Sequence, residues 1–211
     1  MRSRRDLLTA SAHLAGSVLV LLLPGTAAAA PPPDRASLVT AARTYLGRPF
    51  SWGGRDRELD CLGLIFLSWQ DVTGTSWKRI SVYPTKMVAR EQLGAPVPGL
   101  DGVRSAAIPW DQLEPGDFLL FLGSAENPAE PALTTVDGTP MWVWHTGLYS
   151  GGPERRFVVG DHFAGQVVET SLPRYLRQEG SGYEGLFVVR PALPSGDIDA
   201  LHVPPPADAT R

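Results

Sequence analysis

This sequence of 211 residues contains a single cysteine and no long run of basic residues. Cys61 is the single cysteine, so an internal disulfide is excluded, although exported domains often depend on such bonds. The net charge of −3 and the lack of a long basic block exclude nucleic acid as the expected partner. The closely spaced ligands of a metal site are missing too, and we expect no metal and no cofactor.

Long apolar runs are missing as well, apart from a stretch near the N-terminus. Three arginines within the first five residues precede a mainly apolar stretch at 14–23 and a run of small residues at 26–30. This pattern predicts an export signal peptide over residues 1–29, and residues 3–8 resemble a twin-arginine signal. The stretch is shorter than the about 20 residues of a membrane-spanning helix, so we expect no stable membrane span after cleavage. The predicted location is secreted, periplasmic or cell-wall associated, and an uncleaved apolar anchor is the alternative.

The rest of the chain has the pattern of one domain between two proline-rich segments. Residues 30–35 are predicted as a spacer, residues 36–191 as a single folded domain and residues 192–211 as a flexible tail. Hydrophobic residues make up 43% of the chain and charged residues 19%, a balance that supports a hydrophobic core. One domain with one active site is therefore expected.

Helical patterns occupy the first half of the domain and strand patterns the second half. Apolar periodicity predicts three helices, which start at Asp34 or Ser37 and end before Gly47, run from Cys61 to Thr73, and run from Thr85 to Leu93. Residues 94–110 contain too many glycines and prolines for a regular element, and we expect a loop there. Apolar and β-branched runs predict strands at 117–122, 142–149, 156–161, 166–170 and 185–190, with a surface helix at 171–178. This order predicts an α+β domain with helices packed on an antiparallel sheet.

Cys61 follows Asp60 at the predicted start of a helix, where aspartate is a favoured N-cap. Because a helix N-terminus carries about half a positive charge, we expect a stabilised thiolate and a lowered pKa for Cys61. Gly63 in the same turn leaves room for a substrate backbone, and the free N–H groups of that turn can bind an oxyanion. An inert core cysteine and an intermolecular disulfide are the alternatives.

Two histidines are candidate bases for this cysteine, since the other two of the four lie in the predicted signal and tail. Regular alternation along a strand places His145 on one face with Val143 and Gly147. A base needs a polar group that holds its tautomer, and the next predicted strand ends in Asp161 and His162. Asp161 faces His145 if that strand alternates regularly, whereas a bulge or turn presents His162.

Two further interpretations concern the same part of the chain. Cys61 with two histidines is a possible zinc ligand set, although the residues lack a metal-like local spacing. Trp142 and Trp144 are most simply core or surface aromatics, and stacking on a sugar is the alternative for them.

Four short motifs occur in one order along the domain. They are Tyr45 to Gly54 (YLGRPFSWGG), Asp60 to Leu64 (DCLGL), Pro115 to Phe121 (PGDFLLF) and His145 to Tyr149 (HTGLY). Together they resemble the NlpC-type cell-wall cysteine peptidases, and the resemblance covers residues 36–191. It implies a papain-like fold in which the nucleophilic cysteine begins a helix that packs against the sheet.

The resemblance also implies a role for each matching residue. The implied catalytic residues are the nucleophile Cys61, the base His145 and the third polar residue His162, with Asp161 as the alternative. The implied residues of the oxyanion side and the cleft are Phe50, Trp52 and Asp60. The implied partner and substrate is the peptidoglycan stem peptide, cut at a γ-D-glutamyl-diaminopimelate or related amide bond through a cysteine thioester. An amidase or acyltransferase acting on another amide or ester uses the same intermediate and is an alternative.

This sequence departs from the family pattern at three positions. Phe50 stands where members usually have tyrosine, so a hydroxyl is missing, and Leu62 stands where they usually have serine. The third polar residue is expected near Val159, which is apolar. These departures keep an inactive, cell-wall-binding relative as a second alternative. Residues 94–110 and 123–140 are insertions, and we expect the second to cover the cleft or to narrow the substrate range.

Overall fold

The computed structural model describes residues 34–178 and 182–193, so the predicted signal peptide and nearly all of the predicted tail lie outside the described residues. The α-helices are α1 (Arg35–Arg43), α2 (Cys61–Thr73), α3 (Pro84–Ala89) and α4 (Leu172–Leu176). Three short 3-10 helices span Trp77–Arg79, Ser105–Ala107 and Trp110–Gln112. The strands are β1 (Ala95–Arg104), β2 (Phe118–Gly123), β3 (Thr134–Val136), β4 (Thr139–Gly151), β5 (Arg156–Asp161), β6 (Gln166–Ser171) and β7 (Gly185–Arg190). Within this part of the chain, no helix has the length and apolar character needed to cross a membrane.

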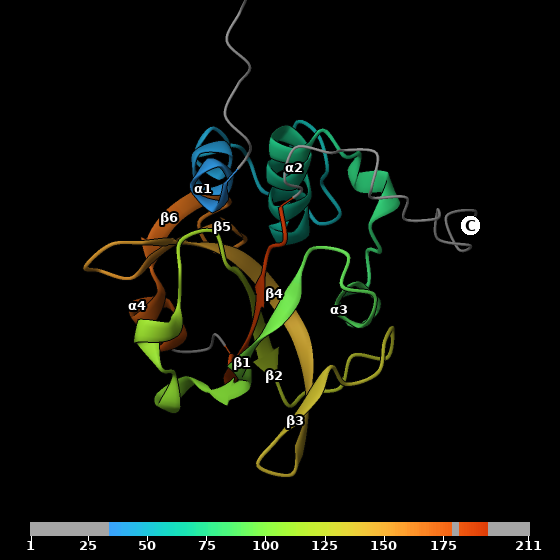
Figure 1. Ribbon diagram of the computed structural model, residues 1–211, viewed down its shortest axis with the longest axis vertical. Coiled ribbons are helices and arrows are strands. Elements are labelled where there is room, and N and C mark those ends of the chain that lie inside the picture. The colour runs from blue at the N-terminus through green and yellow to red at the C-terminus, as the bar shows by residue number, and fades with distance from the viewer. Residues whose placement is uncertain (1–33, 179–181, 194–211) are drawn as a thin grey trace, which may run out of the picture. The chain divides into compact units, whose positions relative to one another are not determined.

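The strands form one antiparallel sheet in the order β1-β7-β2-β4-β5-β6, and β3 pairs with β4 beside this path. Helices α1 and α2 lie side by side at one end of the domain in Figure 1. Their Leu38 and Phe66 share a buried cluster with Phe118 of the sheet. Phe121 belongs to a second cluster, to which α4 contributes Tyr175. Two cores that share one sheet, with helices before strands in the chain, confirm the predicted α+β fold.

Helix α2 has the predicted bounds. It begins at Cys61 after its N-cap Asp60, and it ends at Gly74, whose φ of 69° is the left-handed conformation that closes many helices. Phe66 and Trp69 are buried on the face that was expected to be apolar. The helix could be predicted because both caps and the apolar face lie within residues 60–74.

Two predicted helix ends are wrong. Helix α1 stops at Arg43, before the predicted end near Gly47, because the Gly47 N–H donates to the Val167 carbonyl (2.9 Å) and directs the chain toward the sheet. Helix α3 stops at Ala89, and the left-handed φ of 49° at Glu91 turns the chain away. In both cases tertiary hydrogen bonding or a turn replaces the last helical residues.

The loop expected at residues 94–110 is wrong, since most of it forms β1 at the edge of the sheet. β1 pairs with β7, about ninety residues later in the chain, and its register shifts twice. Gly99 and Gly102 have φ values of 79° and 131°, which suit irregular edge pairing. The helix expected on the surface at 171–178 is also more buried than predicted, because Leu172 and Tyr175 of α4 lie in the second core.

A β-bulge precedes the candidate base on β4. Phe121 pairs with His145 but the next residue of β2, Leu122, pairs with Val143, so Trp144 is an extra residue in the strand. Val143 therefore packs with the helix-side core, while His145 contacts Phe121 of the other core. The regular alternation predicted for Val143 and His145 is wrong for this reason. Bulges of this kind commonly re-aim a side chain beside an active site.

The Pro-Gly-Asp motif before β2 has a structural role. The carboxylate of Asp117 is fully buried and accepts hydrogen bonds from the Glu114 N–H (2.9 Å) and from two nitrogens of Arg190 (both 2.9 Å). Gly116 has a φ of 94° and lies against the backbone of Arg35, where a side chain would clash. Asp117 thus connects the start of β2 to β7, because a buried carboxylate needs such partners, and Gly116 lets the same turn pack against α1.

Candidate active site

Cys61 lies in the first turn of α2, where the helix meets the sheet. Its side chain is buried. Gly160 of β5 makes this approach possible, because a Cβ there would lie 2.9 Å from the Asp60 carbonyl oxygen and 3.2 Å from the Cys61 nitrogen. Thr146 of β4 lies beside the thiol and acts to lower its pKa, and Thr146 directly follows His145. The cysteine is thus placed against two neighbouring strands, one residue from the candidate base along β4.

The carboxylate of Asp60 organises the loop in front of the cysteine. It accepts hydrogen bonds from the Gly63 N–H (2.7 Å) and the Gly53 N–H (2.9 Å), and it forms an ion pair with Arg55. The predicted N-cap is confirmed, and one carboxylate also attaches residues 53–55 to the helix. Asp60 is buried and acts here as a structural partner of the loop and helix.

Gly63 does not leave the open space that the sequence suggested. A Cβ at Gly63 would overlap the Gly54 carbonyl oxygen, which also accepts a hydrogen bond from Arg55 (2.7 Å). The space beside this turn is therefore filled by the protein's own loop. The Gly63 N–H is likewise engaged by Asp60, so it is not free to bind an oxyanion as expected.

Burial raises the pKa of the Cys61 thiol, and the charge of Asp60 raises it further. The neighbouring Thr146 and the Leu62 backbone act in the opposite direction but do not cancel the rise. The expected lowering of the pKa is wrong, because the helix N-terminus that would stabilise a thiolate is capped by a carboxylate and removed from water. At rest the cysteine is a neutral thiol.

The imidazole of His145 lies in an aromatic cluster and is almost fully buried. The ring of Tyr183 is nearly parallel to it at a centroid distance of 5.8 Å, Tyr175 lies at 6.0 Å and Phe121 at 5.8 Å. Burial, followed by the charge of His162, lowers the pKa of His145 to about 3. The ring is therefore neutral at physiological pH and can accept a proton.

Neither candidate for the third polar residue forms a hydrogen bond with His145. The Nε2 atom of His145 is buried and has no partner among the described residues. The carboxylate of Asp161 accepts the Phe163 N–H (2.8 Å). The His162 ring lies 6.3 Å from the His145 ring at 83°, and its buried Nδ1 has no partner in the described structure either. At Val159, where the family pattern predicts a polar group, the side chain is fully buried and apolar.

An open cleft of about 430 Å³ lies beside the buried imidazole of His145. His145, His162 and Tyr183 line it, together with the indoles of Trp52 and Trp144. Phe50 of the motif packs edge to face on Trp52, with ring centroids 5.1 Å apart, and supports this rim.

The insertion at residues 123–140 forms one wall of the cleft. The indole N–H of Trp144 donates to the Ala125 carbonyl (3.0 Å), and that of Trp142 donates to the Glu130 carbonyl (3.1 Å). The carboxylate of Glu130 accepts from the N–H and hydroxyl of Thr85 (3.0 and 2.6 Å). The segment is attached to α3 and β4, so it shapes the cleft as a fixed wall.

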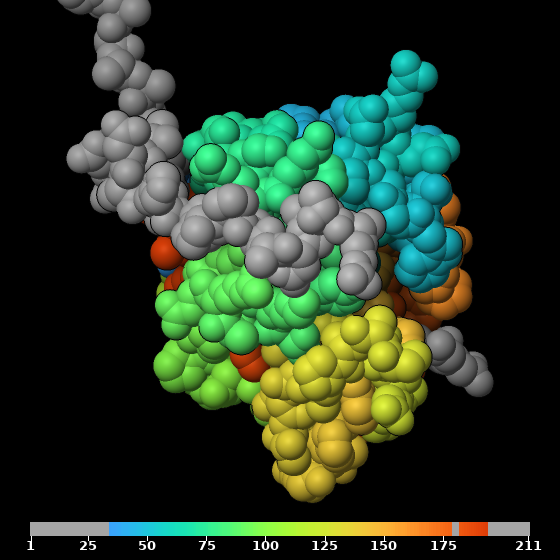
Figure 2. Space-filling view, turned by 90° about the vertical axis from the view of Figure 1, so that its right-hand side faces the viewer, coloured from blue at the N-terminus to red at the C-terminus, as the bar shows by residue number. Residues whose placement is uncertain are grey.

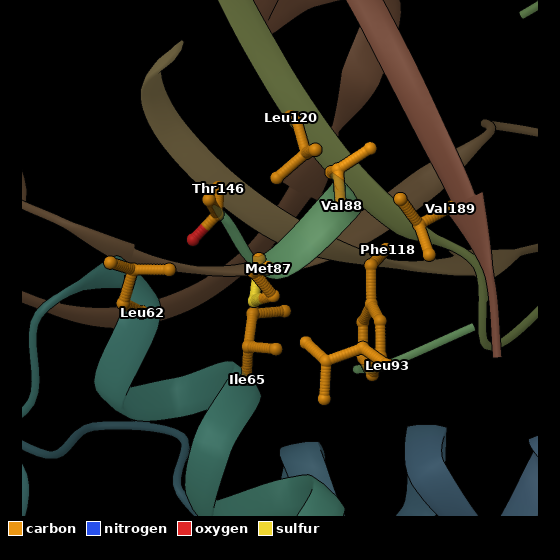
Figure 3. Close-up of a pocket in the computed structure, with 9 residues that line it drawn as sticks. All are labelled: Leu62, Ile65, Met87, Val88, Leu93, Phe118, Leu120, Thr146 and Val189. Carbon is orange, nitrogen blue, oxygen red and sulfur yellow. The ribbon is translucent and has the colours of Figure 1, made fainter. Parts of the chain in front are cut away.

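Behind α2 lies a small apolar gap of about 10 Å³, which Figure 3 shows between this helix, α3 and the sheet. Leu62, Ile65 and Met87 line it, and Thr146 is the one polar side chain among its lining residues. Its volume is at the lower limit for a single water molecule, and its walls offer that water one hydroxyl. It is a packing gap that supports the helix of the nucleophile. Leu62, which replaces the usual serine of the family, completes this apolar packing.

Sequence reasoning missed several residues of the site. Tyr175 and Tyr183 surround the candidate base but lie thirty or more residues after it, with no motif around them. Arg55 and Thr146 complete the surroundings of Asp60 and Cys61. Of these four residues, only Thr146 could have been found from the sequence, because it directly follows His145 within a motif.

Known structures share this fold. The chain is similar to a crystal structure of an N-acetylmuramoyl-L-alanine amidase from Bacteroides uniformis, with a TM-score of 0.59, 12% identity, and coverage of 75% of this chain and 98% of that chain. The NlpC/p60 domain of the peptidoglycan hydrolase SagA matches with a TM-score of 0.43, 21% identity, and coverage of 74% and 98%. The peptidoglycan hydrolase RipB from Mycobacterium tuberculosis matches with a TM-score of 0.44, 20% identity, and coverage of 74% and 63%.

Neither a protein-family model nor a curated protein matches the sequence. The likeness to the amidase structure, at 12% identity, establishes the fold of this chain. That fold agrees with the α+β, papain-like arrangement implied by the sequence motifs.

Proposed function

We propose that this protein is an exported thiol hydrolase that cleaves an amide bond in the peptide part of peptidoglycan. The observation that carries the proposal is the contact of Cys61, at the capped start of α2, with Thr146, the residue next to His145. The buried imidazole of His145, which is neutral at physiological pH, lines the open cleft. The order of the four motifs and the shared fold support this interpretation.

In the resting enzyme the Cys61 thiol and the His145 imidazole are both uncharged. As the sulfur of Cys61 attacks the amide carbonyl, His145 takes the thiol proton, and a tetrahedral oxyanion forms. His145 then gives that proton to the leaving nitrogen, the C–N bond breaks and a thioester remains. Water, activated by the same imidazole, attacks the thioester and releases the carboxylate product and the free thiol. A neutral imidazole is the form that this first step requires.

For the third polar residue we propose His162 over Asp161. His162 lines the cleft beside His145, and its Nδ1 has no other partner among the described residues, whereas the Asp161 carboxylate accepts the Phe163 N–H. Catalytic hydrogen bonds often tighten only when substrate is bound, so the role requires the His162 ring to move toward His145 Nε2 in that complex.

Two amide bonds are candidates. The family resemblance implies the γ-D-glutamyl-diaminopimelate bond of the stem peptide. The fold neighbour is named for the bond between N-acetylmuramic acid and L-alanine. Export by the predicted signal, and by the twin-arginine route that residues 3–8 resemble, would bring the protein to either bond.

Digestion of purified peptidoglycan tests the proposal. The intact chain is expected to release fragments that mass spectrometry identifies, and the Cys61→Ala variant is expected to release none, since the nucleophile is lost. The fragment masses name the bond. If the folded chain releases no fragments, the interpretation as an inactive cell-wall-binding relative replaces the hydrolase.

A further inference from the structure

Two tryptophan side chains on the cleft are unusually exposed. Trp52 is 72% exposed and Trp144 is 45% exposed, and both line the cleft that contains His145. Figure 2 shows the loop before α2 (cyan) and the segment after β2 (yellow-green) on the same face of the molecule. Large aromatic side chains are usually mostly buried, so two exposed indoles at one cleft indicate a surface kept for a ligand.

Both indoles are held in place without a ligand. Trp144 is the bulge residue of β4, its indole N–H donates to the Ala125 carbonyl (3.0 Å), and its ring lies against Gly123. Trp52 packs edge to face on Phe50 at 5.1 Å and lies 5.6 Å from the His162 ring. A ligand that stacks on them therefore orders few side chains on binding.

The charge of the cleft separates the two candidate bonds. Among the described lining residues Glu184 is the one acidic side chain and no lysine or arginine is present. Glu184 is already hydrogen-bonded to Ser124 and ion-paired with Arg104. A γ-glutamyl linkage leaves the α-carboxylate of the glutamate free close to the cut, and this cleft has no side-chain cation to receive it.

We propose that Trp52 and Trp144 form a stacking subsite for the amino-sugar ring that carries the stem peptide. This inference rests on the proposed function and selects its bond, the amide between the lactyl group of N-acetylmuramic acid and L-alanine. The sugar is uncharged, and the C–H groups of its ring present an apolar face to an indole while its hydroxyls stay in water. Cys61 then attacks the lactyl carbonyl, and the L-alanine amine leaves with the proton from His145. Hydrolysis of the thioester returns the lactyl carboxylate.

Binding to the inactive Cys61→Ala chain tests the subsite separately from catalysis. Isothermal titration with N-acetylmuramoyl-L-alanyl-D-isoglutamine and with the sugar-free dipeptide is expected to show about tenfold tighter binding of the sugar-containing ligand. Adding Trp144→Ala or Trp52→Ala is expected to remove that preference. Tyr83→Ala is the matched control, because Tyr83 is similarly exposed (40%) but does not line the cleft.

The outcomes are separable. Equal binding of the two ligands, or a sugar preference that survives loss of both tryptophans, would overturn the subsite even if the intact chain digests peptidoglycan. A sugar preference that depends on the tryptophans, in a chain that cuts nothing, would retain the subsite and remove the hydrolase. Saturation-transfer NMR of the sugar protons on the Cys61→Ala chain gives the same decision without a tryptophan variant, since ring C–H protons in stacking contact must saturate most.

Discussion

Replacing His145 with glutamine is expected to slow peptidoglycan cleavage by about 10²–10⁴-fold, the usual contribution of a general base. The effect is large because burial raises the pKa of the Cys61 thiol, so the nucleophile is not ionised at rest and must lose its proton during attack. Glutamine keeps much of the size of the side chain and cannot accept that proton. His162→Gln is the matched variant, and its effect is expected to be smaller because His162 does not take the thiol proton.

The pH dependence of kcat/KM distinguishes this neutral pair from a thiolate paired with an imidazolium. Lowering of the His145 pKa to about 3 means that protonation inactivates the base only near that pH, so activity is lost as the pH falls through about 3. Because the pKa of Cys61 is raised, ionisation of the thiol changes the rate only above the pH at which an ordinary cysteine ionises. We therefore expect a flat profile between about pH 5 and 8. A fall in kcat/KM below a pH of about 6.5, the ordinary pKa of histidine, would contradict a neutral thiol and imidazole.

A Gly63→Ala substitution is expected to lower the free energy of unfolding by about 1–3 kcal/mol and to slow cleavage by at least about tenfold. Alanine is favoured over glycine within a helix by about 1 kcal/mol, so helix propensity alone predicts stabilisation. The new methyl group would overlap the Gly54 carbonyl oxygen, however, and a backbone atom with its own hydrogen bonds cannot yield cheaply. Overpacking therefore outweighs propensity and displaces the loop that carries Trp52.

Gly74→Ala at the end of the same helix is the control for this prediction. Gly74 has a φ of 69°, and no atom lies within 4 Å of the position that an alanine methyl group would take. Alanine there adds backbone strain of about 1 kcal/mol without a clash. Thermal unfolding is expected to show a lower Tm for both variants, and cleavage is expected to fall in Gly63→Ala alone. Equal activity in the two variants would show that the Gly54 and Gly63 contact does not position the site.

Features coded by neighbouring residues could be predicted from the sequence. Helix α2 has its predicted bounds because Asp60, the apolar face and Gly74 lie within fifteen consecutive residues. The bounds of β5 and β7 also agree with prediction, since both are compact apolar runs between turns. The α+β class follows from the order of these elements.

Features set by distant partners could not be predicted. The glycines and prolines of β1 suggest a loop, and pairing with β7 overrides them. The bulge at Trp144 depends on how β4 pairs with β2, which the sequence of β4 does not show. The prediction that Val143 and His145 share one face was therefore wrong. The pKa of Cys61 was misjudged because the sequence shows the helix N-terminus but not the burial of the thiol against Thr146 and Gly160.

The central claim, a thioester on Cys61, is tested most directly by mass spectrometry of the protein after rapid acid quenching during digestion of peptidoglycan fragments. The account predicts a transient adduct on the peptide that contains Cys61, with the mass of the acyl half of the cleaved substrate, and its loss in Cys61→Ala. Cleavage that continues in Cys61→Ala without any adduct would contradict the account.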